Sequence, residues 1–238
     1  MLEKVDLTLK MSKDESVRQL NDLQLKLIHL EQAIREKGVA ALIVYEGWDA
    51  SGKGGSILRI TQKLDPRSVR VWPIGVPTAE ELSYNYLWRF WNKIPCKGEI
   101  AIFDRSWYGR VLVERVEKLA KPAEWKRAYH EICEFKQFLT DNGLVLIKFW
   151  MQISKEEQLK RFKEREADPY KKWKITKDDW RNRDKWDDYM KAAEDMFSTT
   201  DLCDCPWHLI PAESKYYARV ETCRIVVDRL QEAVGKAK

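Results

Sequence analysis

A glycine-rich loop between an apolar run and a helix-forming segment is the feature that most constrains this fold. The loop follows the apolar run 40–45, precedes the segment 56–60 and reads Gly47-Trp48-Asp49-Ala50-Ser51-Gly52-Lys53-Gly54-Gly55. This order is typical of a P-loop, in which backbone N–H groups and one lysine surround a phosphate. A chance match or a simple helix cap is the competing interpretation, and the flanking segments favour the P-loop. We therefore predict phosphate binding by Gly47, Gly52, Lys53, Gly54 and Gly55.

Two positions in this loop depart from the usual pattern. Gly54 stands where most P-loops have a Ser or Thr whose hydroxyl holds Mg²⁺. Asp49 puts a carboxylate among the phosphates, which it would repel unless a divalent cation bridged the two. We predict that Asp49 is a Mg²⁺ ligand, directly or through water, with Mn²⁺ as a substitute ion.

Five short apolar runs alternate with helix-forming sequence along the chain. We predict strands at Ala40–Tyr45, Val69–Ile74, Ile100–Phe103, Val145–Trp150 and Trp207–Pro211. Alternation of this kind implies a mostly parallel five-stranded sheet with helices on both faces, which is a three-layer α/β/α fold. A helix is expected over about 12–37, and capping boxes are expected to begin three others at Thr78, Ser154 and Thr176.

The predicted third strand ends in a second group of candidate site residues. Ligands of parallel sheets gather at the carboxyl ends of the strands, and Asp104 stands there, where a Walker B carboxylate binds the metal. Arg105 follows at the same rim and is predicted to contact phosphoryl oxygens, while Ser106 can cap the next helix. A surface ion pair is the alternative for Asp104 and Arg105, and the upstream P-loop favours the functional interpretation.

A basic segment between residues 155 and 191 is predicted to form a lid over about 160–185. P-loop kinases of small molecules close such a lid over their phosphates, although mixed acidic residues also suit a solvated helical surface. The phosphate candidates near its break are Arg161, Arg165, Lys171, Lys172 and Lys174. In the aromatic stretch 84–91, which we expect to pack a helix, Arg89 is a further phosphate or ion-pair candidate.

Charge, cysteine content and hydropathy narrow the class of protein. The net charge of +5 over 238 residues is modest, so an anionic partner should meet a local basic cluster. Five cysteines are an odd number in a chain too large to need disulfides, so reduced thiols are expected. The first residues form no apolar signal region, and no run is long enough to span a bilayer. We expect a cytoplasmic protein with no membrane partner.

Four segments together resemble the polyphosphate kinase 2 family. They are Gly47–Gly55, Tyr86–Phe90, Phe103–Tyr108 and Lys160–Arg165. The similarity runs from about residue 15 to 232, and the stretches 103–116 and 180–186 look closest to the polyphosphate:AMP phosphotransferases. Because it covers nearly the whole chain, we expect residues 1–238 to form a single P-loop kinase domain.

The resemblance implies a reaction and assigns roles to residues. It implies Mg²⁺-dependent, reversible transfer of a terminal phosphoryl group from inorganic polyphosphate to AMP, giving ADP, with ADP as a second acceptor that gives ATP. Asp49 and Asp104 would hold the metal, while Lys53, Arg105 and the lid residues would hold polyphosphate. Glu114 and Arg115 match the family's Glu-Arg pair and would position the acceptor or the chain. We predict nucleotide binding by Arg89 and Glu114, and polyphosphate binding by Arg115.

Two other functions compete with this one. An ATP-dependent nucleoside monophosphate kinase would share the loop and the Asp-Arg element, but Gly54 argues against it because a Thr is expected there. A non-enzymatic protein could use the basic lid to bind nucleic acid or polyphosphate. We expect no nucleic-acid partner, and tryptophan-rich apolar surfaces predict a homodimer or homotetramer.

Overall fold

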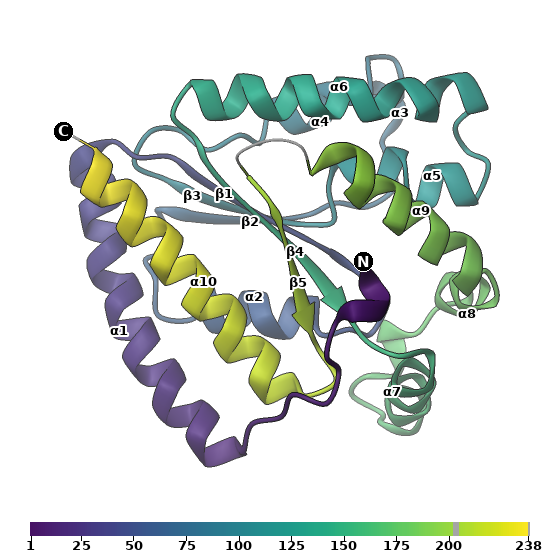
Figure 1. Ribbon diagram of the computed structural model, residues 1–238, viewed down its shortest axis with the longest axis horizontal. Coiled ribbons are helices and arrows are strands. Elements are labelled where there is room, and N and C mark those ends of the chain that lie inside the picture. The colour runs from purple at the N-terminus through teal and green to yellow at the C-terminus, as the bar shows by residue number, and fades with distance from the viewer. Residues whose placement is uncertain (202–204, 238) are drawn as a thin grey trace.

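The computed structural model describes residues 1–201 and 205–237, and a five-stranded sheet lies at its centre (Figure 1). The strands are β1 (Ala41–Gly47), β2 (Val69–Pro73), β3 (Ile100–Asp104), β4 (Val145–Gln152) and β5 (Trp207–Pro211). Every pair of neighbours is parallel, in the order β2-β3-β1-β4-β5. The predicted α/β fold is therefore confirmed.

Helices cover both faces of the sheet (Figure 1). One layer consists of α1 (Lys13–Lys37), α2 (Lys53–Thr61) and α10 (Lys215–Lys236). The opposite layer contains α6 (Pro122–Asp141) and α9 (Trp186–Thr200), with the short helices α3 (Ala79–Leu82), α4 (Trp88–Trp91) and α5 (Val113–Val116) beside them. Single 3₁₀ turns are formed by Leu2–Lys4, Trp107–Arg110 and Lys172–Lys174.

Burial follows the order of the strands. Residues 41–45 of the central strand β1 are fully buried, because neighbours lie on both sides and helices cover both faces. The edge strand β2 is only half covered, and its Val71 is 41% exposed. No helix in the described ranges 1–201 and 205–237 is both long and apolar enough to cross a membrane.

The helix starts follow the capping signals, with one difference. Thr78 and Thr176 form reciprocal capping boxes with Glu81 and Asp179. Ser154 caps α7 (Lys155–Ala167) by accepting from the N–H of Glu157 at 3.1 Å, but the return bond is missing. The Glu157 carboxylate accepts instead from Arg161 Nε at 2.7 Å, because that buried guanidinium needs an anionic partner.

The segment predicted as a lid lies beyond the carboxyl end of β4 (Figure 1). It comprises most of α7, a connection that contains the 3₁₀ turn 172–174, and α8 (Lys177–Asp184). Tyr170 and Trp173, in the connection, are 88% and 73% exposed. The helices thus stand at the edge where the P-loop and Asp104 also lie.

Candidate active site

The P-loop connects β1 to α2, and two of its glycines are required by its shape. Gly47 has φ 129°, and a Cβ there would stand 2.5 Å from the carbonyl oxygen of Met151 on the neighbouring strand β4. Gly52 has φ 106° and precedes the first residue of α2, in a left-handed conformation that favours glycine. These two glycines therefore let the chain turn sharply at the carboxyl end of β1 and enter α2.

Lys53 is the first residue of α2, and its side chain points back to the backbone of the P-loop. Its Nζ donates to the carbonyl oxygens of Gly47 at 2.8 Å and Trp48 at 3.0 Å. Burial lowers the pKa of Lys53, and the charges of Asp49 and Asp104 oppose that shift. A phosphate in the loop would supply the ammonium with anionic acceptors in place of these neutral ones.

Trp48 fixes the loop to the helix layer behind it. Its indole ring stacks on Trp186 at the start of α9, with centroids 3.6 Å apart and planes within 8°. Its Nε1 donates to Gln152 Oε1 at 2.9 Å, and Trp150 Nε1 donates to the same oxygen at 2.8 Å. These tryptophans pack the core and position the loop backbone.

Asp49 is held through both carboxylate oxygens. Oδ1 accepts from Arg105 Nη2 at 2.9 Å, and Oδ2 accepts from Asn182 Nδ2 at 2.9 Å. Tyr189 donates its hydroxyl to Asn182 Oδ1 at 3.2 Å, which sets the orientation of the amide. Asn182 was not predicted, because its position on α8 meets the loop only after the chain folds.

Asp104 ends β3 beside the P-loop, in register with Tyr45 of β1. Arg105 follows in a left-handed conformation with φ 70°, and its N–H donates to the Tyr45 carbonyl at 2.9 Å. Ala50 in the P-loop has φ 61°. Two non-glycine residues in this uncommon conformation at one rim are typical of a functional site.

Asp49 and Asp104 are the candidate Mg²⁺ ligands of the site. Within residues 1–201 and 205–237, no group of three or more His, Cys, Asp or Glu side chains could bind a metal ion. Mg²⁺, however, is commonly held by one or two carboxylates together with water and substrate phosphates. Asp49 and Asp104 both act electrostatically on Lys53, so the oxygen donors at this rim fit such an ion.

Glu46 adds a buried carboxyl group behind the loop. It is 5% exposed, and Ser106 Oγ donates to its Oε1 at 2.8 Å. Burial raises the pKa of Glu46 to about 7, although the Ser106 hydrogen bond and the charge of Lys53 act in the opposite direction. The sequence did not predict this group as part of the site, because its burial and its Ser106 partner come from packing against a distant segment.

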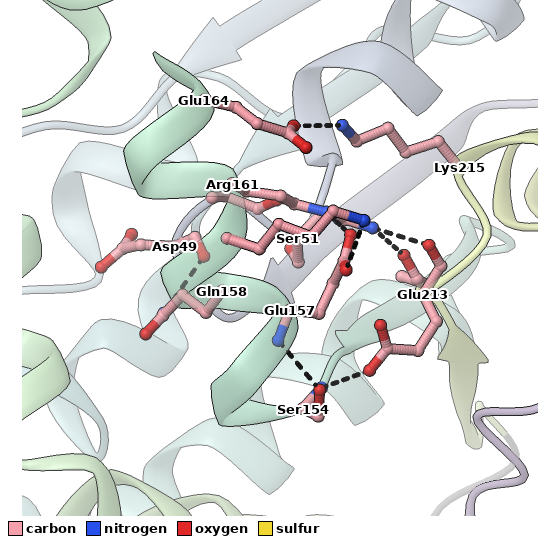
Figure 2. Close-up of polar contacts among 12 residues, drawn as sticks. Asp49, Ser51, Ser154, Glu157, Gln158, Arg161, Glu164, Glu213 and Lys215 are labelled. Atoms are coloured by element: carbon pink, nitrogen blue, oxygen red, sulfur yellow. Dashed lines mark hydrogen bonds and ion pairs between the residues drawn. The ribbon is translucent and has the colours of Figure 1, made fainter. Parts of the chain in front are cut away.

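Side chains of α7 donate hydrogen bonds to the backbone of the P-loop (Figure 2). Gln158 Nε2 donates to the carbonyl of Asp49 at 3.1 Å. Arg161 Nη1 donates to the carbonyls of Ala50 and Ser51 at 3.0 Å each. The spacing of Gln158 and Arg161 on the inner face of an amphipathic helix is the sequence signal that could have revealed this contact.

The structure corrects the prediction that Arg161 binds phosphate. Its Nη2 donates to the carbonyls of Ala212 at 2.7 Å and Glu213 at 2.8 Å, and its Nε donates to Glu157. Because Nη1 is also occupied and the residue is only 2% exposed, no donor is left for a ligand. Arg161 instead links the P-loop, through hydrogen bonds, to the segment between β5 and α10.

The other lid candidates divide into two groups. Arg165, Lys171 and Lys174 line a cavity of about 210 Å³ together with Gly52 and Gly55 of the loop. Lys172 is exposed and is not among the residues that line this cavity. Together with Arg161, which contacts the loop backbone, four of the five predicted basic side chains of the lid therefore lie at the P-loop.

Arg89 and Glu114 lie in a second charged cluster. Arg89 Nε is 3.2 Å from Glu81 Oε2, and Arg110 Nη1 is 3.0 Å from Glu114 Oε2. Burial raises the pKa of Glu114, and the charges of Arg110 and then Arg89 oppose the shift. Arg110, which was not predicted, therefore belongs with the two residues assigned to the nucleotide.

Arg115 is engaged by other helices. Its Nη2 is 2.7 Å from Asp195 Oδ2 on α9, its Nη1 donates to the Tyr129 hydroxyl at 2.7 Å, and its guanidinium lies 4.4 Å from the Trp125 ring centroid on α6. None of its described contacts reaches the P-loop, so the predicted polyphosphate contact is not supported in this conformation. The cause is that Arg115 points between α6 and α9, a direction that sequence position alone does not give.

Comparison with known proteins shows the family of this chain. The family model described as polyphosphate kinase 2 (PPK2) matches residues 10–238. The chain belongs to the polyphosphate kinase 2 family. The solved structure of polyphosphate kinase 2 from Arthrobacter aurescens TC1, with a TM-score of 0.93 and 34% identity, aligns over 98% of this chain and 85% of that one.

Curated members of the family are also similar in sequence. A polyphosphate:AMP phosphotransferase of Pseudomonas aeruginosa is 47% identical over all 238 residues, which correspond to 48% of its own length. One from Acinetobacter johnsonii is 54% identical over 190 residues, or 80% of this chain and 40% of that protein. The chain thus spans about half the length or less of these relatives.

Proposed function

We propose that this chain transfers the terminal phosphoryl group of inorganic polyphosphate to AMP, giving ADP, and to ADP as a second acceptor, in a reversible reaction. The observation that carries the proposal is the meeting of Lys53, Asp49, Asp104 and Arg105 at one rim of the sheet. The names of the similar proteins support polyphosphate as donor and AMP as acceptor.

The mechanism is a direct in-line displacement. A phosphate oxygen of the acceptor forms a bond to the terminal phosphorus, the bridging P–O bond breaks, and the shortened polyphosphate leaves with that electron pair. The P-loop N–H groups and Lys53 hold the donor, and Arg105 offsets charge on the moving group. Mg²⁺ held by Asp49 and Asp104, with Mn²⁺ as a substitute, would supply further neutralisation of phosphate charge. No phosphoenzyme forms, because the two substrates react with each other.

We propose that the acceptor binds on the β3 side of the P-loop. The second charged cluster lies there and contains Arg89, Arg110 and Glu114. Arg110 Nε is buried and has no hydrogen-bond partner in the described part of the chain. A buried guanidinium with a spare donor suits the phosphate of a nucleotide. Glu114 is then the acidic member that can accept from a hydroxyl or amine of the acceptor.

The proposal also includes the cellular compartment and the oligomeric state of the enzyme. We expect cytoplasmic residence, because the odd number of cysteines predicts reduced thiols, which persist in a reducing compartment. A homodimer or homotetramer is supported by exposed aromatic side chains on α4 and α6, of which Trp91 is 43% and Phe138 54% exposed.

The test is a turnover assay with purified protein, Mg²⁺, long-chain polyphosphate, and AMP or ADP in separate reactions, with nucleotides resolved by ion exchange. ADP should appear from AMP only when polyphosphate and Mg²⁺ are both present. Product formed with ATP as donor but not with polyphosphate would instead support the ATP-dependent nucleoside monophosphate kinase, against which Gly54 argues. Polyphosphate binding unaffected by Mg²⁺, without any turnover, would support the non-enzymatic alternative.

A further inference from the structure

Helix α8 carries Asn182 to the P-loop and has little apolar packing of its own. Residues 177–184 all lie in the described range, and none of them is buried. On the side of α7, Trp180 packs edge to face on Phe162, with ring centroids 5.2 Å apart, and Arg183 Nη1 donates to Gln158 Oε1 at 3.2 Å. A helix that is polar on all sides keeps its place through such specific side-chain contacts. The position of Asn182 therefore depends on the partners of α8.

Glu117, directly after α5, holds α8 from the other side. Its Oε2 is 3.0 Å from Arg181 Nε and accepts from Lys185 Nζ at 2.9 Å. Lys185 is the residue at which α8 ends and α9 begins. The Glu117 side chain is 9% exposed, and its Oε1 is buried and accepts no hydrogen bond among residues 1–201 and 205–237. A carboxylate in this setting depends on its cations, and both of these belong to α8 and its end.

The short helix α5 relates this contact to the second charged cluster. Glu114 of the same helix pairs with Arg110 in that cluster, at 3.0 Å. Arg115, the next residue, pairs with Asp195 of α9 at 2.7 Å. Successive side chains of one turn thus reach the cluster assigned to the acceptor, α9 and α8. Through Glu117, α8 is fixed relative to the helix that carries Glu114.

On its other face α8 reaches a candidate metal ligand. Asn182 Nδ2 donates to Asp49 Oδ2, and the Tyr189 hydroxyl donates to Asn182 Oδ1. Burial raises the pKa of Tyr189, and the charges of Glu117 and then Asp49 raise it further. The hydroxyl therefore stays protonated and remains a donor. Since both carboxylates act on this one hydroxyl, Glu117 and Asp49 belong to a single connected group of polar side chains.

We propose that Glu117 is a positioning residue, which holds α8 where Asn182 can orient the Asp49 carboxylate. The inference rests on the proposed function, in which Asp49 holds Mg²⁺. Hydrogen bonds from neighbouring groups orient the ligands of a metal, and loss of such a neighbour usually lowers metal affinity or activity about 10–100-fold. Glu117 thus acts on the metal side of the site from the helix that also carries Glu114.

The first test is Glu117→Gln, which removes the charge and keeps the shape. Hydrogen exchange of the ligand-free protein, followed by mass spectrometry, should show the amides of 177–184 exchanging about tenfold faster, with those of α1 unchanged. In the turnover assay kcat should fall about tenfold, and the Mg²⁺ concentration that gives half the maximal rate should rise. The KM for AMP should change less than about twofold, because Glu114 and Arg110 are intact.

The second test is a double-mutant cycle with Asn182→Ala. If Glu117 acts through Asn182, its substitution should add nothing once that amide is gone. The double variant Glu117→Gln/Asn182→Ala should then have the kcat of Asn182→Ala alone. Losses that multiply to about a hundredfold would overturn the inference, because they would show that the two residues act independently.

Glu31→Gln is the matched control, and Lys185→Gln is the second variant. Glu31 is also a buried carboxylate, and it accepts from the N–H of Asp65 at 2.9 Å and from Ser68, which precedes β2. Its substitution should leave the exchange of α8 and kcat as in wild type. Lys185→Gln removes one cation from the other end of the contact and leaves Glu117 in place. It should change α8 exchange and kcat in the same directions as Glu117→Gln.

The outcomes separate this inference from the function on which it rests. Absence of polyphosphate-dependent turnover in wild type would overturn the proposed function, while hydrogen exchange would still report whether Glu117 and Lys185 hold α8. Normal wild-type turnover, with α8 exchange unchanged in both variants, would overturn the inference alone. An equal rise of exchange in α1 and α8 would also overturn it, because it would show a general loss of stability.

Discussion

At the scale of single residues, the charged groups of the site are held by internal partners. Lys53 donates to two carbonyls of its own loop, and Asp49 accepts from Arg105 and Asn182. These partners satisfy charges that are buried or half-buried. Replacing one of these residues would leave its partners without a hydrogen bond, so each position should be sensitive to substitution.

Asp49→Asn, Lys53→Ala and Asp104→Asn should each lower kcat by roughly two orders of magnitude or more, because phosphoryl transfer depends on charge and alignment. The thermal unfolding midpoint should stay within a few degrees of wild type. The turnover assay and circular dichroism measure the two quantities. A near-normal kcat in any one variant would remove that residue from the site.

Arg161→Gln tests the corrected role of this side chain. Its guanidinium donates to Glu157 and to four backbone carbonyls while 2% exposed, so its loss should cost roughly 2–4 kcal/mol of the free energy of unfolding. Urea denaturation measures this cost. Unchanged stability with a raised KM for polyphosphate would restore the original prediction of a phosphate contact.

At the scale of elements, β4 combines core packing with an unusual charge. Lys148 lies in this strand with 0% exposure, 3.6 Å from Asp201 and with its Nζ 4.9 Å from the Trp207 ring centroid. Burial lowers the pKa of Lys148 to about 8, and the nearby charge of Lys136 lowers it further. Lys136 itself donates to the carbonyl of Thr200 at the end of α9.

Because of this buried lysine, the free energy of unfolding should depend on pH in the alkaline range. Its pKa falls from 10.5 to about 8 on folding, so the unfolded state binds more protons between these values and the free energy of unfolding should rise with pH there. Lys148→Met should make that rise smaller, while Lys53, whose pKa is also lowered by burial, still contributes to it. The same variant should add roughly 2–3 kcal/mol to the free energy of unfolding at pH 7. Urea denaturation at pH 7 and at about pH 9.5 tests this, with the exposed Lys26→Met as control. A rise as large in Lys148→Met as in wild type would refute the assignment.

At the scale of the whole molecule, apolar side chains remain exposed over α4 and α6. Trp91 and Phe138 contact edge to face with ring centroids 5.2 Å apart, and buried Phe135 lies beneath them, 5.0 Å from Trp91. Exposed aromatics on top of a buried one are typical of an interface between protein chains.

We therefore expect self-association through this face. Phe138→Glu should weaken the homodimer or homotetramer at least about tenfold, because a charge would replace a central apolar contact. Light scattering coupled to size exclusion, over a range of concentrations, measures the change. Leu25→Glu on α1, where the leucine is 54% exposed, is the control. Equal masses for wild type and both variants would exclude this face.

Local patterns were enough to predict much of the fold. The five strands and the caps at Thr78 and Thr176 follow from apolar runs and short-range hydrogen bonds, whose partners lie a few residues apart. The P-loop was predictable for the same reason, since Gly47, Gly52 and Lys53 act within a single turn of chain.

The sequence by itself determined the parallel α/β fold, the loop and the carboxylates at its rim, because these depend on periodicity and on fixed local geometry. Only the tertiary structure decided which basic side chains line the cavity beside the P-loop. It buried Arg161 under the loop, turned Arg115 toward α6 and α9, and brought Lys215 and Arg219 to the cavity. The physical reason is that a charge is directed by the burial and partners that distant segments supply, and spacing along the chain does not specify these.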